Sequence, residues 1–205
     1  MATIWLITGG VRSGKSRLAV RLAAEFDSVT YVATAEAGDA EMTQRIAAHR
    51  AERPAGWRTI EEPQDLAGAI NEAGAIGRPD DSCLIVDCLT LWTSNRLFPA
   101  DWPDASGGDA ATAQLTARQD ETLRDAAKVV TNLQERPGTA VVVTNEVGSG
   151  VIPPDPRLRA WEDTLGAVNS LVAAAADRLY LCVAGQAIDM KALGARPVGE
   201  IDADS

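Results

Sequence analysis

Short apolar runs alternate with helical patterns along this chain. Buried strands are predicted where β-branched and other apolar residues follow one another: residues 4–7, 29–34, 82–87, 139–144 and 178–183. Helices are predicted where apolar residues recur at helical spacing: residues 17–24, 39–51, 65–74, 89–98, 110–134 and 157–176. A short strand is expected within residues 53–63, and a last strand or turn at residues 188–191. This alternation predicts an α/β protein with a mostly parallel sheet.

The first apolar run ends in a glycine-rich loop. The loop has the complete G-x-x-x-x-G-K-[ST] pattern and consists of Gly9, Gly10, Val11, Arg12, Ser13, Gly14, Lys15 and Ser16. Because it joins a strand to a helix, its amides and the positive end of the helix face one spot, which suits a polyphosphate. Lys15 is expected to reach the β and γ phosphates, and Ser16 to hold Mg²⁺ through its hydroxyl. The loop predicts binding of a nucleoside triphosphate.

Composition narrows the class of protein. A chain of 205 residues is long enough for one domain, which we expect at residues 1–192 with a loose tail at 193–205. The formal net charge of −10 argues against a nucleic-acid partner, because binding to a phosphate backbone requires a basic face. The three cysteines form no C-x-x-C pair, and no apolar run reaches membrane-spanning length. We therefore expect a cytoplasmic protein with reduced thiols and no membrane span.

Two strand ends are candidates for the nucleotide site. Asp87 ends an apolar run, as does the Walker B carboxylate that helps to hold the metal, although any buried strand can end in an acid. Ligands of open α/β sheets lie beyond the carboxyl ends of the strands. The end of the second strand is therefore expected to line the site with Ala33, Thr34 and Ala35.

His49 is the only histidine of the chain. It falls on one face of its predicted helix with Met42 and Ile46, so it either completes an apolar face as a structural residue or acts as a nucleophile. The second alternative gains weight from the arginines around it, which would neutralise the oxygens of a phosphorus under attack: Arg45, Arg50, Arg53 and Arg58.

Three further features remain open. Glu61 and Glu62 either end a strand in solvent, or one of them accepts hydrogen bonds from a guanine edge. Glu146 follows the strand at residues 139–144, and it either orients a hydroxyl or metal-bound water or caps its turn. Residues 99–109 are rich in Pro, Gly, Asp and Ser, and form either a mobile lid or a surface insertion.

Together these motifs resemble one family, the bifunctional adenosylcobinamide kinase / adenosylcobinamide-phosphate guanylyltransferase of cobalamin biosynthesis. The likeness covers residues 4–191. The phosphate loop occurs in many families, so the specific part is the histidine-bearing helix followed by Arg-Pro, Trp and Glu-Glu-Pro. The motifs that carry the resemblance are residues 9–17, 31–35, 45–54, 57–63, 87–92 and 144–148.

The resemblance implies a RecA-like, three-layer α/β/α P-loop fold, two reactions and a homotrimer. In the first reaction, ATP or GTP phosphorylates the aminopropanol hydroxyl of adenosylcobinamide. In the second, His49 attacks the α phosphate of GTP and passes GMP to adenosylcobinamide phosphate. Mg²⁺ would be held by Ser16 and Asp87. Where family members often carry a second histidine just before this position, this chain has Ala48. The residues implied to contact the nucleotide, besides the phosphate loop, are Ala33, Thr34, Ala35, Arg50, Ala51, Glu52, Arg53, Glu61 and Asp87.

Two other functions compete with this one. A P-loop kinase of small molecules with a single function would use the same phosphate loop and leave His49 as a structural residue. A RecA-like ATPase module would use hydrolysis to act on a partner chain and would make no phosphorylated small product. If the protein is only a kinase, replacement of His49 leaves all activity in place, whereas the bifunctional enzyme would lose guanylyl transfer. If it is an ATPase module, a partner chain stimulates its hydrolysis.

Overall fold

The computed structural model describes residues 2–51, 53–74, 79–99 and 109–201. Its strands are β1 (Thr3–Gly9), β2 (Ser28–Ala33), β3 (Arg58–Glu61), β4 (Ser82–Asp87), β5 (Thr139–Val143), β6 (Arg178–Val183) and β7 (Gln186–Asp189). They form one seven-stranded sheet in the order β3-β2-β4-β5-β1-β6-β7. Neighbouring strands are parallel except β6 and β7, which are antiparallel. The mostly parallel sheet predicted from the sequence is confirmed.

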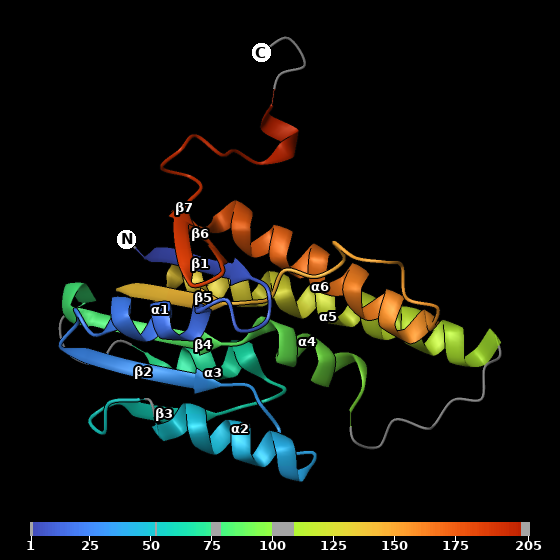
Figure 1. Ribbon diagram of the computed structural model, residues 1–205, viewed down its shortest axis with the longest axis horizontal. Helices are drawn as coiled ribbons and strands as arrows, with labels where there is room; N and C mark the ends of the chain where they lie inside the picture. The colour runs from blue at the N-terminus through green and yellow to red at the C-terminus, as the bar shows by residue number, and fades with distance from the viewer. Residues whose placement is uncertain (1, 52, 75–78, 100–108, 202–205) are drawn as a thin grey trace.

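Helices cover both faces of this sheet (Figure 1). They are α1 (Lys15–Ala23), α2 (Ala40–Ala51), α3 (Leu66–Ala73), α4 (Leu89–Leu97), α5 (Asp109–Glu135) and α6 (Pro156–Ala175), with 3₁₀ turns at Pro79–Asp81 and Val198–Glu200. Helices α3 to α6 share one apolar cluster with the sheet, whereas α1 belongs to a second cluster. This arrangement confirms the three-layer α/β/α architecture.

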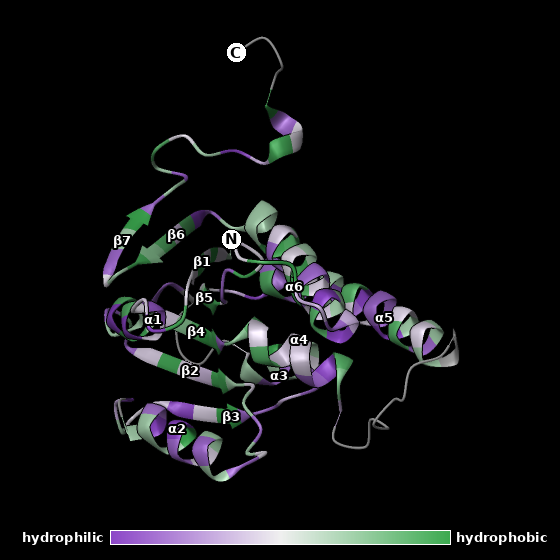
Figure 2. Ribbon diagram, turned by 45° about the vertical axis from the view of Figure 1, so that its right-hand side comes forward, coloured by the Kyte–Doolittle hydropathy of each residue, from purple (hydrophilic) through white to green (hydrophobic). Residues whose placement is uncertain are grey.

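The two central strands β4 and β5 explain why the core has two sides. Alternate residues of a strand point to opposite faces, so Leu84 and Val86 join the cluster with α3 to α6, and Cys83 and Ile85 join the cluster with α1. Both faces are therefore apolar, as is typical of a parallel sheet that is covered by helices on both sides. Figure 2 shows hydrophobic colours along these strands.

Helix α2 differs from the others because it contributes no buried residue. It lies beside the edge strand β3, and Figure 2 shows hydrophilic and hydrophobic colours mixed along it. Its start is capped, since the carboxylate of Asp39 accepts a hydrogen bond of 2.7 Å from the backbone N–H of Met42. None of the described helices is both long and apolar enough to cross a membrane.

The structure differs from the sequence prediction at some boundaries. Helix α1 begins at Lys15, two residues before the predicted start, because the phosphate loop leads directly into its first turn. The last strand lies at Gln186–Asp189 and pairs with β6, so the uncertain segment is a strand that begins earlier than expected. Residues 100–108 of the Pro-rich segment and residues 202–205 of the tail lie outside the described residues.

Candidate active site

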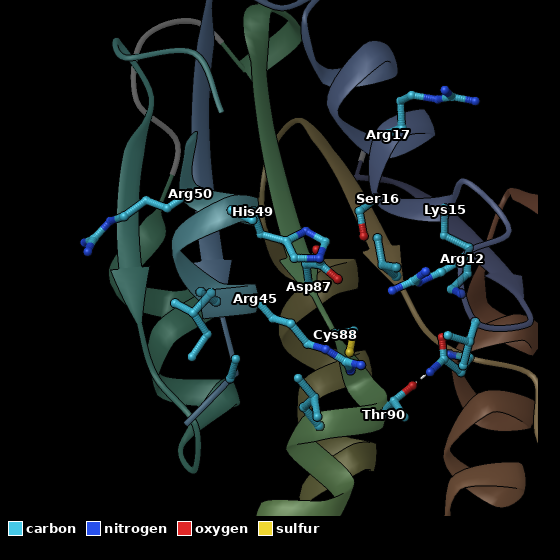
Figure 3. A pocket seen from close by; sticks show the side chains of 18 of the residues that line it. Arg12, Lys15, Ser16, Arg17, Arg45, His49, Arg50, Asp87, Cys88 and Thr90 are labelled. Carbon is cyan, nitrogen blue, oxygen red and sulfur yellow. Dashed lines mark hydrogen bonds between the residues drawn. The ribbon is translucent and has the colours of Figure 1, made fainter. Parts of the chain in front are cut away.

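A cavity of about 770 Å³ lies where β1, β2, β4 and β5 end. The phosphate loop and the start of α1 form one wall, which we call the phosphate-loop wall and which consists of residues 11–17. Helix α2 forms the opposite wall, called the α2 wall, with Met42, Arg45, Ile46, Ala48, His49 and Arg50. Figure 3 shows Ser16 and Lys15 on one side, His49 and Arg45 on the other, and Asp87 between them.

The phosphate loop requires glycine at two positions. Gly9 has a φ of 143°, and a Cβ atom there would lie 2.1 Å from the backbone oxygen of Cys182. Gly14 has a φ of 102° and precedes the first residue of α1. These backbone angles are accessible to glycine but costly for other residues. Gly9 is buried and Gly10 is exposed, and neither of them lines the cavity.

Lys15 is the buried cation of this wall, with 7% of its surface exposed. Its Nζ atom donates a hydrogen bond of 2.7 Å to the backbone oxygen of Gly10. Burial lowers the pKa of Lys15, although Cys88 and Asp87 act in the opposite direction. A polyphosphate in the cavity would add negative charge beside this ammonium group, so the wall suits an anion.

Asp87 ends β4 in the middle of the cavity, and one of its oxygens accepts a hydrogen bond from the hydroxyl of Tyr31. Tyr31 is 2% exposed, and burial and the Asp87 carboxylate raise its pKa, so it stays protonated and donates. Ser16 lies across from Asp87 on the phosphate-loop wall (Figure 3). A serine hydroxyl and a carboxylate oxygen are the ligands that Mg²⁺ accepts beside phosphate oxygens and water.

Mg²⁺ at this place would need few protein ligands. Within the described part of the chain, no group of three or more His, Cys, Asp or Glu residues is placed to hold a metal ion. Mg²⁺ usually keeps several waters and is held by one or two protein oxygens plus substrate phosphates. The pair Ser16 and Asp87 therefore fits a metal that arrives with its nucleotide.

The end of β2 is only partly in the cavity. Ala33 and Ala35 line it, whereas Thr34 is 0% exposed and lies behind it. The hydroxyl of Thr34 donates to the backbone oxygen of Cys88 at 2.7 Å and accepts from the backbone N–H of Cys88 at 2.8 Å. Thr34 thus fixes the backbone that follows Asp87, and the sequence pattern gave no sign of this contact.

Three of the four arginines expected around His49 line the cavity: Arg45, Arg50 and Arg53. Arg45 points into it, and Arg50 turns toward the rim (Figure 3), where it pairs with Glu61 at 3.0 Å. Arg58 instead pairs with Glu72 of α3 at 2.6 Å and does not face His49. The expectation for Arg58 is wrong because its strand position directs the side chain away from α2.

Arg53 connects the two walls. Its guanidinium lies 3.7 Å from the centre of the Tyr31 ring, a cation–π contact, and it follows α2 directly along the chain. Because the Tyr31 hydroxyl donates a hydrogen bond to Asp87, Tyr31 links Arg53, which follows α2, to the Asp87 carboxylate. A tyrosine inside a buried apolar strand gave no signal of this role in the sequence.

The acidic residues separate in the structure. Glu61 lines the cavity, whereas the carboxylate of Glu62 accepts hydrogen bonds of 2.8 Å from the backbone N–H groups of Gln64 and Asp65 and so supports the turn. Glu146 is exposed outside the cavity and accepts a hydrogen bond of 3.4 Å from the Thr8 hydroxyl. Ala51 lies on α2 away from the lining, and Glu52 lies outside the described residues.

Further lining residues were not predicted as site residues, among them Arg17, Tyr31, Cys88, Thr90 and Leu91. Cys88 is a free thiol, and burial together with the neighbouring Asp87 raises its pKa to about 12. Its thiol is therefore protonated near neutral pH and is a poor nucleophile. His49 lies on the cavity wall and is exposed, and an imidazole is a group that can attack phosphorus.

Known proteins resemble this chain over most of its length. CobP of Pseudomonas aeruginosa, a bifunctional adenosylcobalamin biosynthesis protein, is 44% identical over 187 residues, which cover 91% of this chain and 96% of the relative. CobU of Salmonella typhimurium, which carries the same description, is 38% identical over 188 residues, or 91% of this chain and 98% of the relative. A solved ATPase of a type III secretion system has a TM-score of 0.48 at 13% identity, over 87% of this chain and 50% of that one.

A family model covers the same region. Residues 5–190 match the family described as cobinamide kinase / cobinamide phosphate guanyltransferase. That region includes the phosphate loop, the histidine-bearing helix α2 and the strand that ends in Asp87, which are the elements that form the cavity. The chain belongs to the cobinamide kinase / cobinamide phosphate guanyltransferase family.

Proposed function

We propose that this enzyme carries out two consecutive reactions of cobalamin biosynthesis in one cavity. It first phosphorylates the aminopropanol hydroxyl of adenosylcobinamide with a nucleoside triphosphate, ATP or GTP. It then transfers GMP from GTP to adenosylcobinamide phosphate and forms adenosylcobinamide-GDP. The observation that carries the proposal is that a phosphate loop and a lone histidine face each other across the same cavity (Figure 3). Family membership supports both activities.

In the phosphorylation step, the phosphate-loop wall holds the triphosphate. The amides of residues 9–16 and the ammonium group of Lys15 neutralise its oxygens, as is usual for such a loop. The substrate hydroxyl forms a bond to the γ phosphorus while the bond to the bridging β–γ oxygen breaks, and the nucleoside diphosphate leaves. Mg²⁺ bound through Ser16 and Asp87 would neutralise charge on the phosphates.

In the transfer step, His49 is the nucleophile. One nitrogen of its ring forms a bond to the α phosphorus of GTP, the α–β phosphoanhydride bond breaks, and pyrophosphate leaves. An oxygen of adenosylcobinamide phosphate then attacks the same phosphorus, the N–P bond breaks, and the imidazole is regenerated. Imidazole suits this task because it has a neutral form near neutral pH and forms a labile bond to phosphorus. Arg45 and Arg53 would offset the charge of the phosphate oxygens.

Other residues that line the cavity would contact the rest of the nucleotide. Ala33 and Ala35 would leave it room beside β2, and Glu61, on the same lining, would accept hydrogen bonds from the guanine edge. We assign both reactions to a single catalytic domain at residues 1–192. The enzyme is a cytoplasmic homotrimer in this proposal, as its likeness to the family implies, and sedimentation equilibrium tests that assembly.

Labelling of the protein by GTP tests the function. The purified protein is incubated with Mg²⁺ and GTP labelled at the α phosphate, denatured and mapped by peptide. We expect label on the peptide that contains His49, lost in acid and stable in alkali as for a phosphoramidate, and no label from GTP labelled at the γ phosphate. Tight GTP binding without covalent label would instead indicate a kinase or ATPase and refute the transfer step.

A further inference from the structure

Asn145 lies between the phosphate loop and Asp87, at a place that none of the steps above uses. Strand β5 pairs with β4 on one side and with β1 on the other, and Val143 is level with both Asp87 and Ile7. The residues just after β5 therefore enter the space between the carboxylate and the glycines that follow β1. Of these, Asn145 lines the cavity. The γ phosphate of a bound triphosphate must lie in this space, because Lys15 and Asp87 flank it.

The backbone of Asn145 is held by hydrogen bonds to side chains of two helices, α4 and α6. Its N–H donates a hydrogen bond of 2.7 Å to the hydroxyl of Thr90 on α4, drawn as a dashed line at Thr90 in Figure 3. Its carbonyl oxygen accepts a hydrogen bond of 2.9 Å from the side-chain amide of Asn169 on α6. The amide oxygen of Asn169 in turn accepts a hydrogen bond of 2.7 Å from the hydroxyl of Thr144. The network fixes Asn145 without the use of its own side-chain amide.

The two threonines of this network are buried, which makes the arrangement rigid. Thr144 is 0% exposed and Thr90 is 5% exposed, so their hydroxyls must find partners inside the protein. No hydrogen bond joins the side-chain amide of Asn145 to another residue in the described ranges 2–51, 53–74, 79–99 and 109–201. A half-buried amide held in a rigid place and left without a protein partner is available to a ligand.

The neighbour Glu146 shows the opposite behaviour. Its backbone N–H donates to Gly9 at 3.2 Å, and its carboxylate is turned to Thr8, outside the cavity. A carboxylate would also repel a phosphoryl group, whereas an amide is neutral and offers both an N–H donor and an oxygen acceptor. The sequence made Glu146 the candidate at this position, but the side chain that faces the cavity is the amide of Asn145.

We propose that Asn145 is a catalytic residue of the phosphorylation step and touches the transferring γ phosphoryl group. Its amide N–H donates to a γ oxygen while the substrate hydroxyl bonds to phosphorus, the β–γ bridging bond breaks, and the hydroxyl proton leaves to solvent. Donors fixed in advance at such oxygens stabilise the transition state without reorganisation. This inference rests on the proposed function and adds a residue to its first reaction.

The same contact between Asn145 and the γ phosphate should not accelerate guanylyl transfer. There the bond that breaks joins the α phosphorus to the α–β bridging oxygen, and the γ phosphate leaves unchanged within pyrophosphate. A contact to the γ phosphate is then equally strong before and during the reaction, and such uniform binding does not accelerate it. Loss of Asn145 should therefore separate the two activities of one cavity.

The test compares Asn145→Ala with Glu146→Ala in the full-length enzyme. Phosphorylation of adenosylcobinamide and formation of the guanylyl-enzyme are each measured at saturating GTP. We expect Asn145→Ala to lower kcat of phosphorylation by about 10²-fold to 10³-fold, as for loss of one fixed donor, with KM for the triphosphate changed less than about fivefold. Guanylyl-enzyme formation should stay within about threefold of wild type. Glu146→Ala should leave both rates unchanged.

Asn145→Asp guards against a folding defect. It keeps the size and the backbone hydrogen bonds but places a negative charge at the γ phosphate, so phosphorylation should fall further than in Asn145→Ala. Equal loss of both reactions in Asn145→Ala, or full phosphorylation activity in it, would overturn the role of Asn145. A wild-type enzyme that phosphorylates no adenosylcobinamide would instead refute the proposed function itself, and the two failures are thus distinguishable.

Discussion

The two walls of the cavity are built in opposite ways. The phosphate-loop wall joins a buried strand to a buried helix face, and its Lys15 and Ser13 are 7% exposed each. The α2 wall carries His49 on a helix without a buried residue, supported by exposed pairs such as Arg50 with Glu61. The phosphate-loop wall is thus part of the core, and the α2 wall lies on the surface of the protein.

The difference follows from what each wall must do. A polyphosphate is recognised by amides and a cation that are fixed and partly desolvated, which requires a rigid and buried frame. A nucleophile that takes GMP from GTP and passes it to a second, large substrate must be reached by both, which requires exposure. The comparison teaches that the wall with the buried contacts is the one proposed to hold the phosphates, and that the exposed wall is the one proposed to carry out the transfer.

The largest expected effect tests the α2 wall. His49→Ala should reduce guanylyl-enzyme formation on the order of 10⁴-fold or more, because the nucleophile is lost. Phosphorylation should remain near the wild-type rate. The free energy of unfolding should change by less than about 0.5 kcal/mol, because His49 is exposed. Gln44→Ala on the outer face of α2 is the control, and full guanylyl transfer in His49→Ala would contradict the comparison.

The phosphate-loop wall should behave in the reverse manner. Lys15→Met should lower both reactions by about 10²-fold to 10³-fold through loss of the cation at the phosphates. It should nevertheless raise the free energy of unfolding of the nucleotide-free enzyme, because burial disfavours the charged ammonium group and lowers its pKa. Denaturant titrations of both proteins measure this, and a destabilised Lys15→Met enzyme would refute it.

The same lysine predicts a pH dependence. Between its lowered folded-state pKa and the ordinary value of 10.5, the unfolded chain binds more protons at Lys15 than the folded chain does. The free energy of unfolding of the wild type should therefore rise with pH in this window relative to that of Lys15→Met, so the advantage of the variant should shrink. Comparison of the two proteins isolates the contribution of Lys15, and an advantage of Lys15→Met that grows with pH would contradict the assignment.

A smaller effect is expected at Glu61, on the rim between the walls. If its carboxylate binds guanine, Glu61→Gln should lower the preference for GTP over ATP in protein labelling about tenfold, the size of one charged hydrogen bond. The free energy of unfolding should fall by less than about 1 kcal/mol, because the pair with Arg50 is exposed. Glu72→Gln, which breaks the similar exposed pair with Arg58, is the control and should leave the preference unchanged.

The smallest effect is expected at Tyr31, where the two walls meet. Tyr31→Phe keeps the ring under Arg53 but removes the hydrogen bond to Asp87. The carboxylate loses its fixed orientation, so Mn²⁺ used in place of Mg²⁺ should bind the nucleotide complex about fivefold more weakly, or about 1 kcal/mol. Electron paramagnetic resonance titration measures free Mn²⁺. Tyr180→Phe, outside the cavity, is the control, and equal affinity in both variants would exclude the role of Tyr31.

The sequence alone determined the frame of the molecule and its ligand class. Strand runs that end at Asp87 and at residue 144, and the glycine pattern before Lys15, are local signals, because backbone periodicity and glycine angles depend on neighbours along the chain. Those signals placed the phosphate loop at the end of β1 and predicted the α/β architecture that the structure confirms. They also placed His49 with Met42 and Ile46 on one face, and all three line the cavity.

Only the tertiary structure decided which of two neighbouring polar residues faces the cavity. Asn145 lines the cavity and Glu146 does not. Thr34 is buried behind the site, and Arg58 pairs with Glu72. The tertiary structure also brought Tyr31 against Asp87. Each of these outcomes depends on the direction of a side chain and on partners from other elements, and a shift of one residue along a strand reverses that direction. Local patterns fix where an element begins and ends, but packing between elements far apart in the chain fixes what its side chains touch.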